Sequence, residues 1–73
     1  MLKDSIKRHR QTLGLSQQAL AQRVGCRRIS IVHYEKGRVI PPLVTLQALA
    51  KAFGISLDDL VNAPEREEEK AHA

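Results

Sequence analysis

The sequence contains little cysteine and few aromatic residues: one Cys among 73 residues, and 3% Phe, Trp and Tyr together. Cys26 alone cannot close a disulfide within the chain and cannot build a cysteine-rich zinc site. No apolar run reaches the roughly 18 residues that a transmembrane helix needs. The opening residues MLKDS lack the apolar core of a secretory signal. These absences favour a cytoplasmic protein with a reduced thiol.

The sequence also lacks the motifs of common catalytic sites. It contains no glycine-rich phosphate loop, no H-E-x-x-H pair and no nucleophile elbow. Its histidines, His9, His33 and His72, are scattered along the chain. Cys26 and His33 could share one helix face, but two ligands do not make a metal site. We therefore expect no enzyme activity, no cofactor and no bound metal.

The charged residues are unevenly distributed. Residues 3–38 contain nine Lys or Arg against two acids, a net charge of +7, whereas residues 39–63 carry −1 and residues 64–73 carry −2. A polyanion is the natural partner of such a basic half, whether DNA, RNA or an anionic membrane. The alternative is a solvated surface that only keeps the protein in solution. Charge alone does not separate these two interpretations.

Four glycines divide most of the chain into segments with helical spacing, because glycine readily takes the left-handed conformation that ends a helix. Ser16 and Ser56 are suitable N-caps for the second and fifth segments, and a proline pair at 41–42 precedes the fourth. No long segment alternates apolar and polar residues, so no sheet is expected. The pattern predicts an all-α fold, a compact bundle of five short helices. The glycines are Gly14, Gly25, Gly37 and Gly54.

The predicted domain boundary follows the fifth helical segment. Residues 1–63 are expected to form the folded domain, and Pro64 ends it. Residues 64–73 have no apolar stripe, so they form a charged C-terminal tail that frays or extends the helix by a turn or two.

The apolar side of the fifth helical segment is a candidate dimer interface. Leu57, Leu60 and Val61 either form that interface or complete the core of the monomer.

Residues 17–36, QQALAQRVGCRRISIVHYEK, carry the most informative pattern. Ala21 is small where two helices would cross closely, and Gly25 follows four residues later, where a tight turn needs a positive φ. Cys26 suits a small apolar slot in the turn. These features favour a helix-turn-helix over two helices that pack for stability alone. Its seven core positions are Leu20, Ala21, Val24, Gly25, Cys26, Ile31 and Tyr34.

Three stretches carry a family resemblance: LSQQALAQRVG, SIVHYEKGR and LVTLQALAKAFGISLDDL. Together they resemble the phage-repressor and Cro type of helix-turn-helix domain, the xenobiotic-response-element family, over about residues 2–62. The resemblance implies a lambda/434 repressor-like bundle that binds double-stranded operator DNA as a homodimer, with the helix over 27–36 in the major groove. In that family an arginine of the first helix pairs with a glutamate near the end of the third. Arg10 and Glu35 match these positions, which predicts a bracing ion pair.

The outward face of the 27–36 helix supplies the predicted base contacts. Arg28 can donate two hydrogen bonds to guanine, and Ile29 can pack on a thymine methyl group. Generic phosphate attraction is the alternative for the two arginines, and a plain surface position is the alternative for Val32. The predicted base contacts are Arg27, Arg28, Ile29, Val32 and His33; the predicted phosphate contacts are Arg10, Gln17, Lys36 and Arg38.

Two features depart from the family pattern. Arg27 occupies the N-cap position of its helix, where Ser or Thr is common, and an arginine side chain cannot accept a hydrogen bond. Val39 and Ile40 stand where polar or basic residues are common. These two residues either pack on the following helix or are exposed at an interface.

The sequence as a whole predicts a sequence-specific DNA-binding transcriptional regulator, a repressor that occupies its operator as a homodimer. The alternative is a protein-interaction module, or an antitoxin, whose main partner is another protein. The protein-interaction module predicts weak DNA binding without sequence preference. RNA is a less favoured partner, because the exposed face of the 27–36 helix has no aromatic side chain to stack on unpaired bases. No membrane partner is expected.

Overall fold

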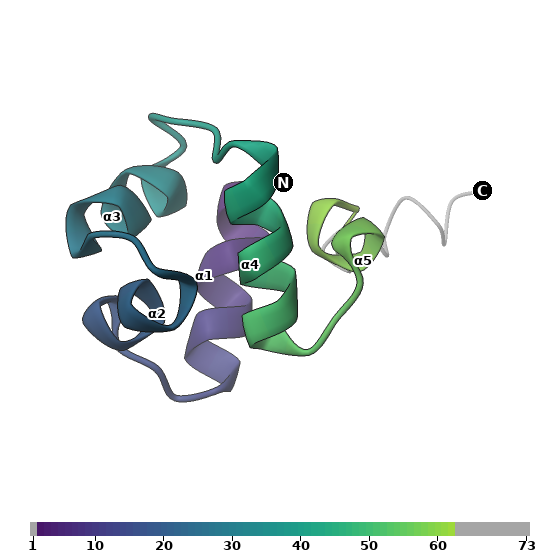
Figure 1. The fold of residues 1–73 in the computed structure, drawn as a ribbon, viewed down its shortest axis with the longest axis horizontal. Coiled ribbons are helices and arrows are strands. Elements are labelled where there is room, and N and C mark those ends of the chain that lie inside the picture. The colour runs from purple at the N-terminus through teal and green to yellow at the C-terminus, as the bar shows by residue number, and fades with distance from the viewer. Residues whose placement is uncertain (1, 63–73) are drawn as a thin grey trace.

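Five α-helices make up the part of the chain that the computed structural model describes, residues 2–62 (Figure 1). No strand occurs among these residues, so the predicted all-α fold of five helices is confirmed. Within the same range no helix is long and apolar enough to span a membrane. The predicted charged tail lies outside the described residues. The helices are α1 (Leu2–Thr12), α2 (Gln17–Val24), α3 (Arg28–Lys36), α4 (Leu43–Phe53) and α5 (Leu57–Val61).

The helix starts follow the capping residues that the sequence provides. The Ser16 hydroxyl accepts a hydrogen bond from the Ala19 amide at 3.0 Å, and the Ser56 hydroxyl accepts one from the Asp59 amide at 2.9 Å. Each bond satisfies one of the amide groups that a helix N-terminus leaves without an intrahelical partner. Arg27, at the N-cap of α3, makes no such side-chain bond, as its chemistry predicts.

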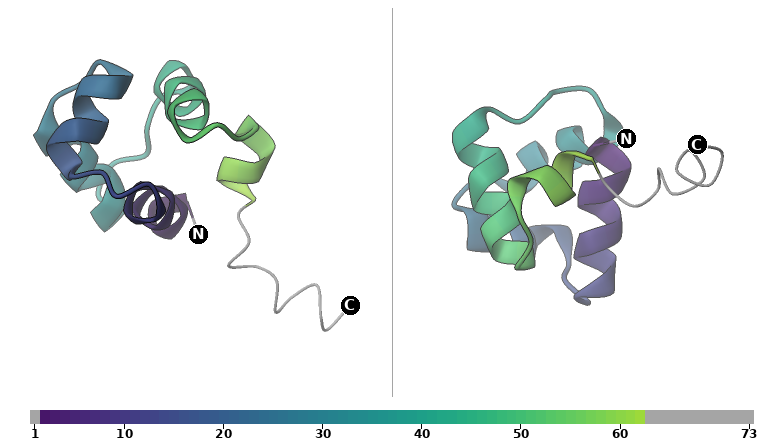
Figure 2. Two further views of the ribbon diagram at one scale, coloured as in Figure 1. Left: turned by 90° about the horizontal axis from the view of Figure 1, so that it is seen from below. Right: turned by 90° about the vertical axis from the view of Figure 1, so that its right-hand side faces the viewer.

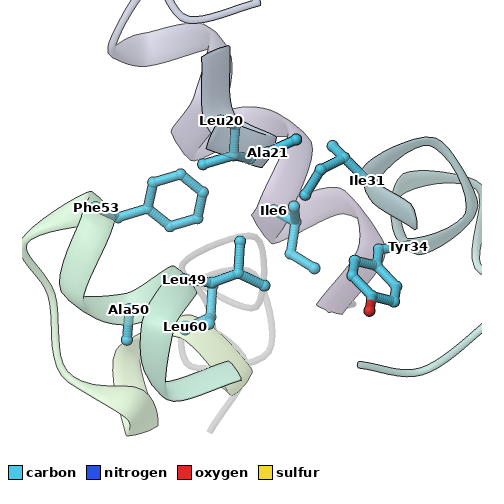
Figure 3. Packing of buried hydrophobic residues seen from close by; sticks show 9 residues of the cluster. All are labelled: Ile6, Leu20, Ala21, Ile31, Tyr34, Leu49, Ala50, Phe53 and Leu60. Atoms are coloured by element: carbon cyan, nitrogen blue, oxygen red, sulfur yellow. The ribbon is translucent and has the colours of Figure 1, made fainter. Parts of the chain in front are cut away.

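The core is assembled from all five helices (Figure 3). Large apolar side chains meet at its centre with no exposed surface, and burying each contributes about 1.5–3 kcal/mol. Leu60 of α5 is one of them, because α5 packs against both α1 and α4. The prediction that Leu60 lies in a dimer interface is therefore wrong. The fully buried residues of this centre are Ile6, Leu20, Ile31, Leu49 and Leu60.

The other candidate dimer residues of α5 are only partly accessible. Leu57 is half-buried, and Val61 is 41% exposed. These two residues leave a small apolar surface on a helix of five residues. Without Leu60 the predicted α5 interface has lost its central apolar side chain.

The segment between α3 and α4 differs from the rest of the surface. Val39 and Ile40 are exposed, at 48% and 80%, so neither residue is part of the core. Pro41 is buried instead and anchors the segment. The first two residues of α4, Leu43 and Val44, are also exposed. This end of the molecule therefore presents apolar side chains to solvent.

Candidate nucleic-acid interface

α2, α3 and the turn between them form a helix-turn-helix. Gly25 has φ +79° and ends α2, and both its amide and the Cys26 amide donate to the Ala21 carbonyl, at 2.9 and 3.0 Å. Only glycine takes this left-handed backbone conformation without strain. Leu20, Ala21, Ile31 and Tyr34 are buried, and Val24 and Cys26 pack against them. The turn and these packed side chains hold α3 at a fixed angle to α2, and the two helices pack against each other (Figure 2).

The side of α3 opposite its buried residues is open to solvent. Arg28 and Ile29 lie in the first turn of the helix, and Ile29 is 46% exposed. A charged donor and an apolar side chain thus stand side by side at the helix start, free of other protein contacts that would cover them. Of the five residues predicted to contact bases, Arg27, Arg28 and Ile29 are exposed, whereas Val32 and His33 are half-buried.

His33 presents one ring nitrogen inward. Its Nδ1 atom is buried and has no hydrogen-bond partner among the described residues. A buried N–H without an acceptor is costly, so the neutral ring is best accommodated with its proton on Nε2. His33 would then act as a hydrogen-bond donor through Nε2.

The predicted pair of Arg10 and Glu35 is present and connects α1 to α3. The guanidinium donates from Nε to Glu35 Oε2 at 2.6 Å and from Nη2 to Oε1 at 3.2 Å. Its Nη1 donates to the Leu15 carbonyl at 2.8 Å. The Gln17 side-chain amide also donates to Glu35 Oε1, at 3.2 Å. One carboxylate therefore ties together α1, the start of α2 and the end of α3.

These bonds engage two of the side chains that are predicted to contact phosphates. Arg10 is only 12% exposed and all three of its guanidinium nitrogens are engaged. The amide of Gln17 is held by Glu35. Both side chains therefore belong to the brace, and a phosphate contact from Arg10 or Gln17 stays a prediction; both residues line the pocket beside the brace. The Gln17 backbone N–H remains in the first turn of α2, where an anion is favoured.

A surface pocket of about 460 Å³ opens beside this brace. Lys7 from α1 and Lys36 from the end of α3 contribute cations to its wall, and Ser16 marks the start of α2. The sequence interpretation did not single out Lys7, although its spacing of three residues from Arg10 places both on one face of α1. The pocket is lined by Lys7, Arg10, Ser16, Gln17, Val32, Glu35 and Lys36.

Two further predicted positions behave as expected of exposed cations. Lys36 and Arg38 are both exposed and follow one another across the turn at Gly37. The Arg38 amide donates to the His33 carbonyl at 3.0 Å, which fixes the backbone that carries its side chain. Both cations therefore extend the basic surface of α3 at its C-terminal end.

Cys26 is the one thiol of this surface. It is half-buried in the turn, and burial raises the pKa of the thiol. It therefore stays protonated and behaves as a small apolar side chain. No group of three or more potential metal ligands occurs among residues 2–62.

Comparison with known proteins places this geometry among helix-turn-helix proteins. Residues 6–60 match the family described as helix-turn-helix. An uncharacterized HTH-type transcriptional regulator of Methanothermobacter thermautotrophicus is 47% identical over 49 residues, which cover 67% of this chain and 71% of the relative. The HTH-type transcriptional regulator PuuR of Escherichia coli is 38% identical over 60 residues, 82% of this chain but 32% of PuuR.

Two solved structures of the P22 c2 repressor have the same fold. Its DNA-binding domain in solution superimposes with a TM-score of 0.83 at 30% identity, covering 88% of this chain and 84% of that one. A crystal structure of the P22 c2 repressor in complex with a synthetic operator gives a TM-score of 0.79 at 32% identity, covering 82% of this chain and 91% of that one.

Proposed function

Since the chain belongs to the phage-repressor-like helix-turn-helix family, we propose that it is a transcriptional regulator that binds double-stranded DNA and represses by occupying an operator. The observation that carries this proposal is the exposed start of α3, where Arg28 and Ile29 stand on a helix fixed by the turn and by the Arg10–Glu35 pair. In such domains the N-terminal residues of the second helix of the motif contact base edges in the major groove.

The proposed readout combines polar and apolar contacts. Arg28 donates to O6 and N7 of a guanine, and Ile29 packs on a thymine methyl group. His33, one turn beyond Ile29, donates from Nε2 to a base or phosphate acceptor. Val32 lines the pocket beside the brace and contacts the sugar–base edge there. Each good base contact discriminates by about 1–3 kcal/mol.

Phosphates are proposed to bind at the rim of this face. The pocket of Lys7, Lys36 and the α2 N-terminus combines two cations with free backbone amides, the combination that favours an anion. Arg38 extends the same basic surface. Glu35 also lines this pocket, but its carboxylate is paired with Arg10 and its side chain is only 4% exposed.

Two copies are proposed to bind one operator. A single short helix covers only a few base pairs, which gives limited specificity, whereas a twofold pair reads two half-sites. The half-sites would then lie about 34–36 Å apart, one turn of DNA.

Selection of bound duplexes from a random pool at roughly 0.15 M salt tests the proposal, because salt at this level suppresses pure phosphate attraction. We expect an enriched palindrome. Arg28→Ala should lose the preference at one position of each half-site. Arg23→Ala is the matched control, because Arg23 is equally an exposed arginine but lines a different groove, between α2 and α4. It should leave the preference intact.

A pool that yields no enriched sequence would contradict the proposal. Binding that is weak, indifferent to sequence and steeply dependent on salt would leave only phosphate attraction. The function would then be that of a protein-interaction module, and partners would have to be sought among proteins.

A further inference from the structure

One row of side chains on α3 contains a histidine. Ile29, His33 and Lys36 stand at i, i+4 and i+7, so they share one face of the helix. α3 packs on α1 and α2 and lies at one edge of the bundle (Figure 1). Ile29 and Lys36 are exposed, whereas His33 is half-buried. At the outer end of its ring, a neutral histidine offers either a hydrogen-bond donor or an acceptor, and the tautomer decides which.

The buried side of the His33 ring selects the tautomer. Its Nδ1 atom is buried and has no hydrogen-bond partner among residues 2–62. A proton on Nδ1 would bury an N–H group without an acceptor, and protein interiors contain fewer buried donors without partners than buried acceptors. The neutral ring therefore carries its proton on Nε2, at the end of the ring that is farther from the backbone. The outer end of His33 is thus a donor and offers no acceptor.

His9 on α1 has the opposite arrangement and provides an internal reference. Its Nδ1 atom lies 2.8 Å from the Ser5 carbonyl oxygen. A carbonyl oxygen only accepts hydrogen bonds, so Nδ1 of His9 carries a proton. The His9 ring also stacks on Phe53, with the ring centroids 5.3 Å apart, which fixes its orientation. The neutral rings of His9 and His33 are therefore opposite tautomers within one small domain.

A side chain that only donates distinguishes the edges that bases present in the major groove. Guanine presents two acceptors, N7 and O6, and no donor, whereas cytosine presents only its N4 donor. Adenine places the N6 donor beside the N7 acceptor, and thymine presents O4 beside its methyl group. A donor aimed at cytosine meets another donor, while a donor aimed at guanine meets an acceptor across the whole edge. Guanine is therefore the best partner of such a side chain and cytosine the worst.

We propose that His33 determines specificity for guanine at one position of each half-site, because its buried Nδ1 atom restricts the ring to donating from Nε2. This inference rests on the proposed DNA-binding function and adds to it the base that the second turn of α3 selects. Arg28 lies five residues earlier on α3, about 7.5 Å along the helix axis. Base pairs stack about 3.4 Å apart, so Arg28 and His33 address different base pairs.

Selection from a random duplex pool at roughly 0.15 M salt tests the inference when it is repeated with variants of His33. We expect the native chain to enrich guanine at a position that is unaffected by Arg28→Ala. A guanine-to-cytosine exchange there should weaken the native chain about fivefold and His33→Ala hardly at all. His33→Gln should shift the preference to adenine, because a glutamine amide both donates to N7 and accepts from N6. The matched control on the same helix face, Lys36→Gln, should weaken binding to all sequences alike.

The possible results separate the inference from the function on which it depends. An unchanged guanine preference in His33→Ala would overturn the inference and leave the proposed function intact. A uniform loss of affinity in His33→Ala, with every base preference kept, would show that His33 contacts a phosphate, which also overturns the inference. Absence of any selected sequence would instead contradict the proposed function.

The tautomer of His33 provides a test that needs no DNA and uses the native chain. Nitrogen-15 NMR of the imidazole rings at about pH 8, above the ordinary titration range of histidine, shows which ring nitrogen carries the proton. We expect the proton on Nε2 of His33 and on Nδ1 of His9, and the signals that vanish in His33→Gln identify the first ring. A proton on Nδ1 of His33, or an equal mixture of the two tautomers, would overturn the inference.

Discussion

Arg10 and Glu35, 25 positions apart in the chain, form a two-point ion pair between α1 and the end of α3. Both side chains are largely removed from solvent, at 12% and 4% exposure. The planar guanidinium matches the two oxygens of the carboxylate, so the pair fixes orientation as well as distance. The helix that carries the proposed base contacts is therefore held at both ends, by the turn at Gly25 and by this pair.

Removing one partner of this pair should be costly. Glu35→Leu leaves the Arg10 guanidinium largely buried without a carboxylate and frees the Gln17 amide, so we expect a loss of about 3–5 kcal/mol in the free energy of unfolding. Urea denaturation monitored by circular dichroism measures this change. A single domain of this size has only a few kcal/mol to lose, so a large fraction of the variant should be unfolded at 37 °C.

The matched variant replaces both charges. Arg10→Met combined with Glu35→Leu leaves no unpaired charge, and an apolar pair of similar volume is often as stable as a buried ion pair. We expect the double variant to be more stable than Glu35→Leu alone. Equal destabilisation of the two variants would show that the pair contributes by packing rather than by charge.

The salt dependence of DNA binding should identify the cations that neutralise phosphates. Arg38→Ala removes an exposed cation from the basic rim, so the slope of log affinity against log salt should become shallower by about 0.9 for each protomer. Base preference should not change. Lys51→Ala is the control, because Lys51 is exposed on α4 in the groove that it shares with Arg23. A slope that changes only in Lys51→Ala would move the DNA contact to that groove.

The sequence allowed the five helices, their serine caps and the core of the helix-turn-helix to be predicted, because each depends on local chemistry or on spacing. The hydrogen-bond and packing partners of individual side chains could not be predicted in the same way. Gln17 stands at a helix start that suits an anion, yet its amide is held by Glu35, which is distant in sequence. Leu60 has the same spacing whether it faces the core or a partner, and only the packing of α5 on α1 and α4 decides that it is buried.

The thiol of Cys26 should make stability depend on alkaline pH. Because burial raises its pKa in the folded state, the unfolded chain loses the thiol proton first as the pH rises. The unfolded state then binds fewer protons, so stability falls as the pH rises through and above the ordinary thiol range. Thermal unfolding measured between neutral pH and this range should show a steeper fall in stability for the native chain than for Cys26→Ala.

Alkylation of Cys26 should likewise be slower in the folded chain than in urea, and equal rates would contradict a buried thiol.

Arg27 offers a substitution with opposite effects on stability and on DNA binding. It has extended N-cap geometry, φ −87° and ψ 152°, but no side-chain bond to the first turn of α3. A serine has the acceptor that this position lacks, so Arg27→Ser should add about 1 kcal/mol to the free energy of unfolding. The same change removes an exposed cation from the proposed base-reading face, so operator affinity should fall.

Arg27→Ala separates the two effects, because it loses the cation without gaining a cap. This variant should bind the operator as weakly as Arg27→Ser but should not gain stability. If Arg27→Ser kept full affinity, Arg27 would be a plain surface residue, and base recognition would begin at Arg28.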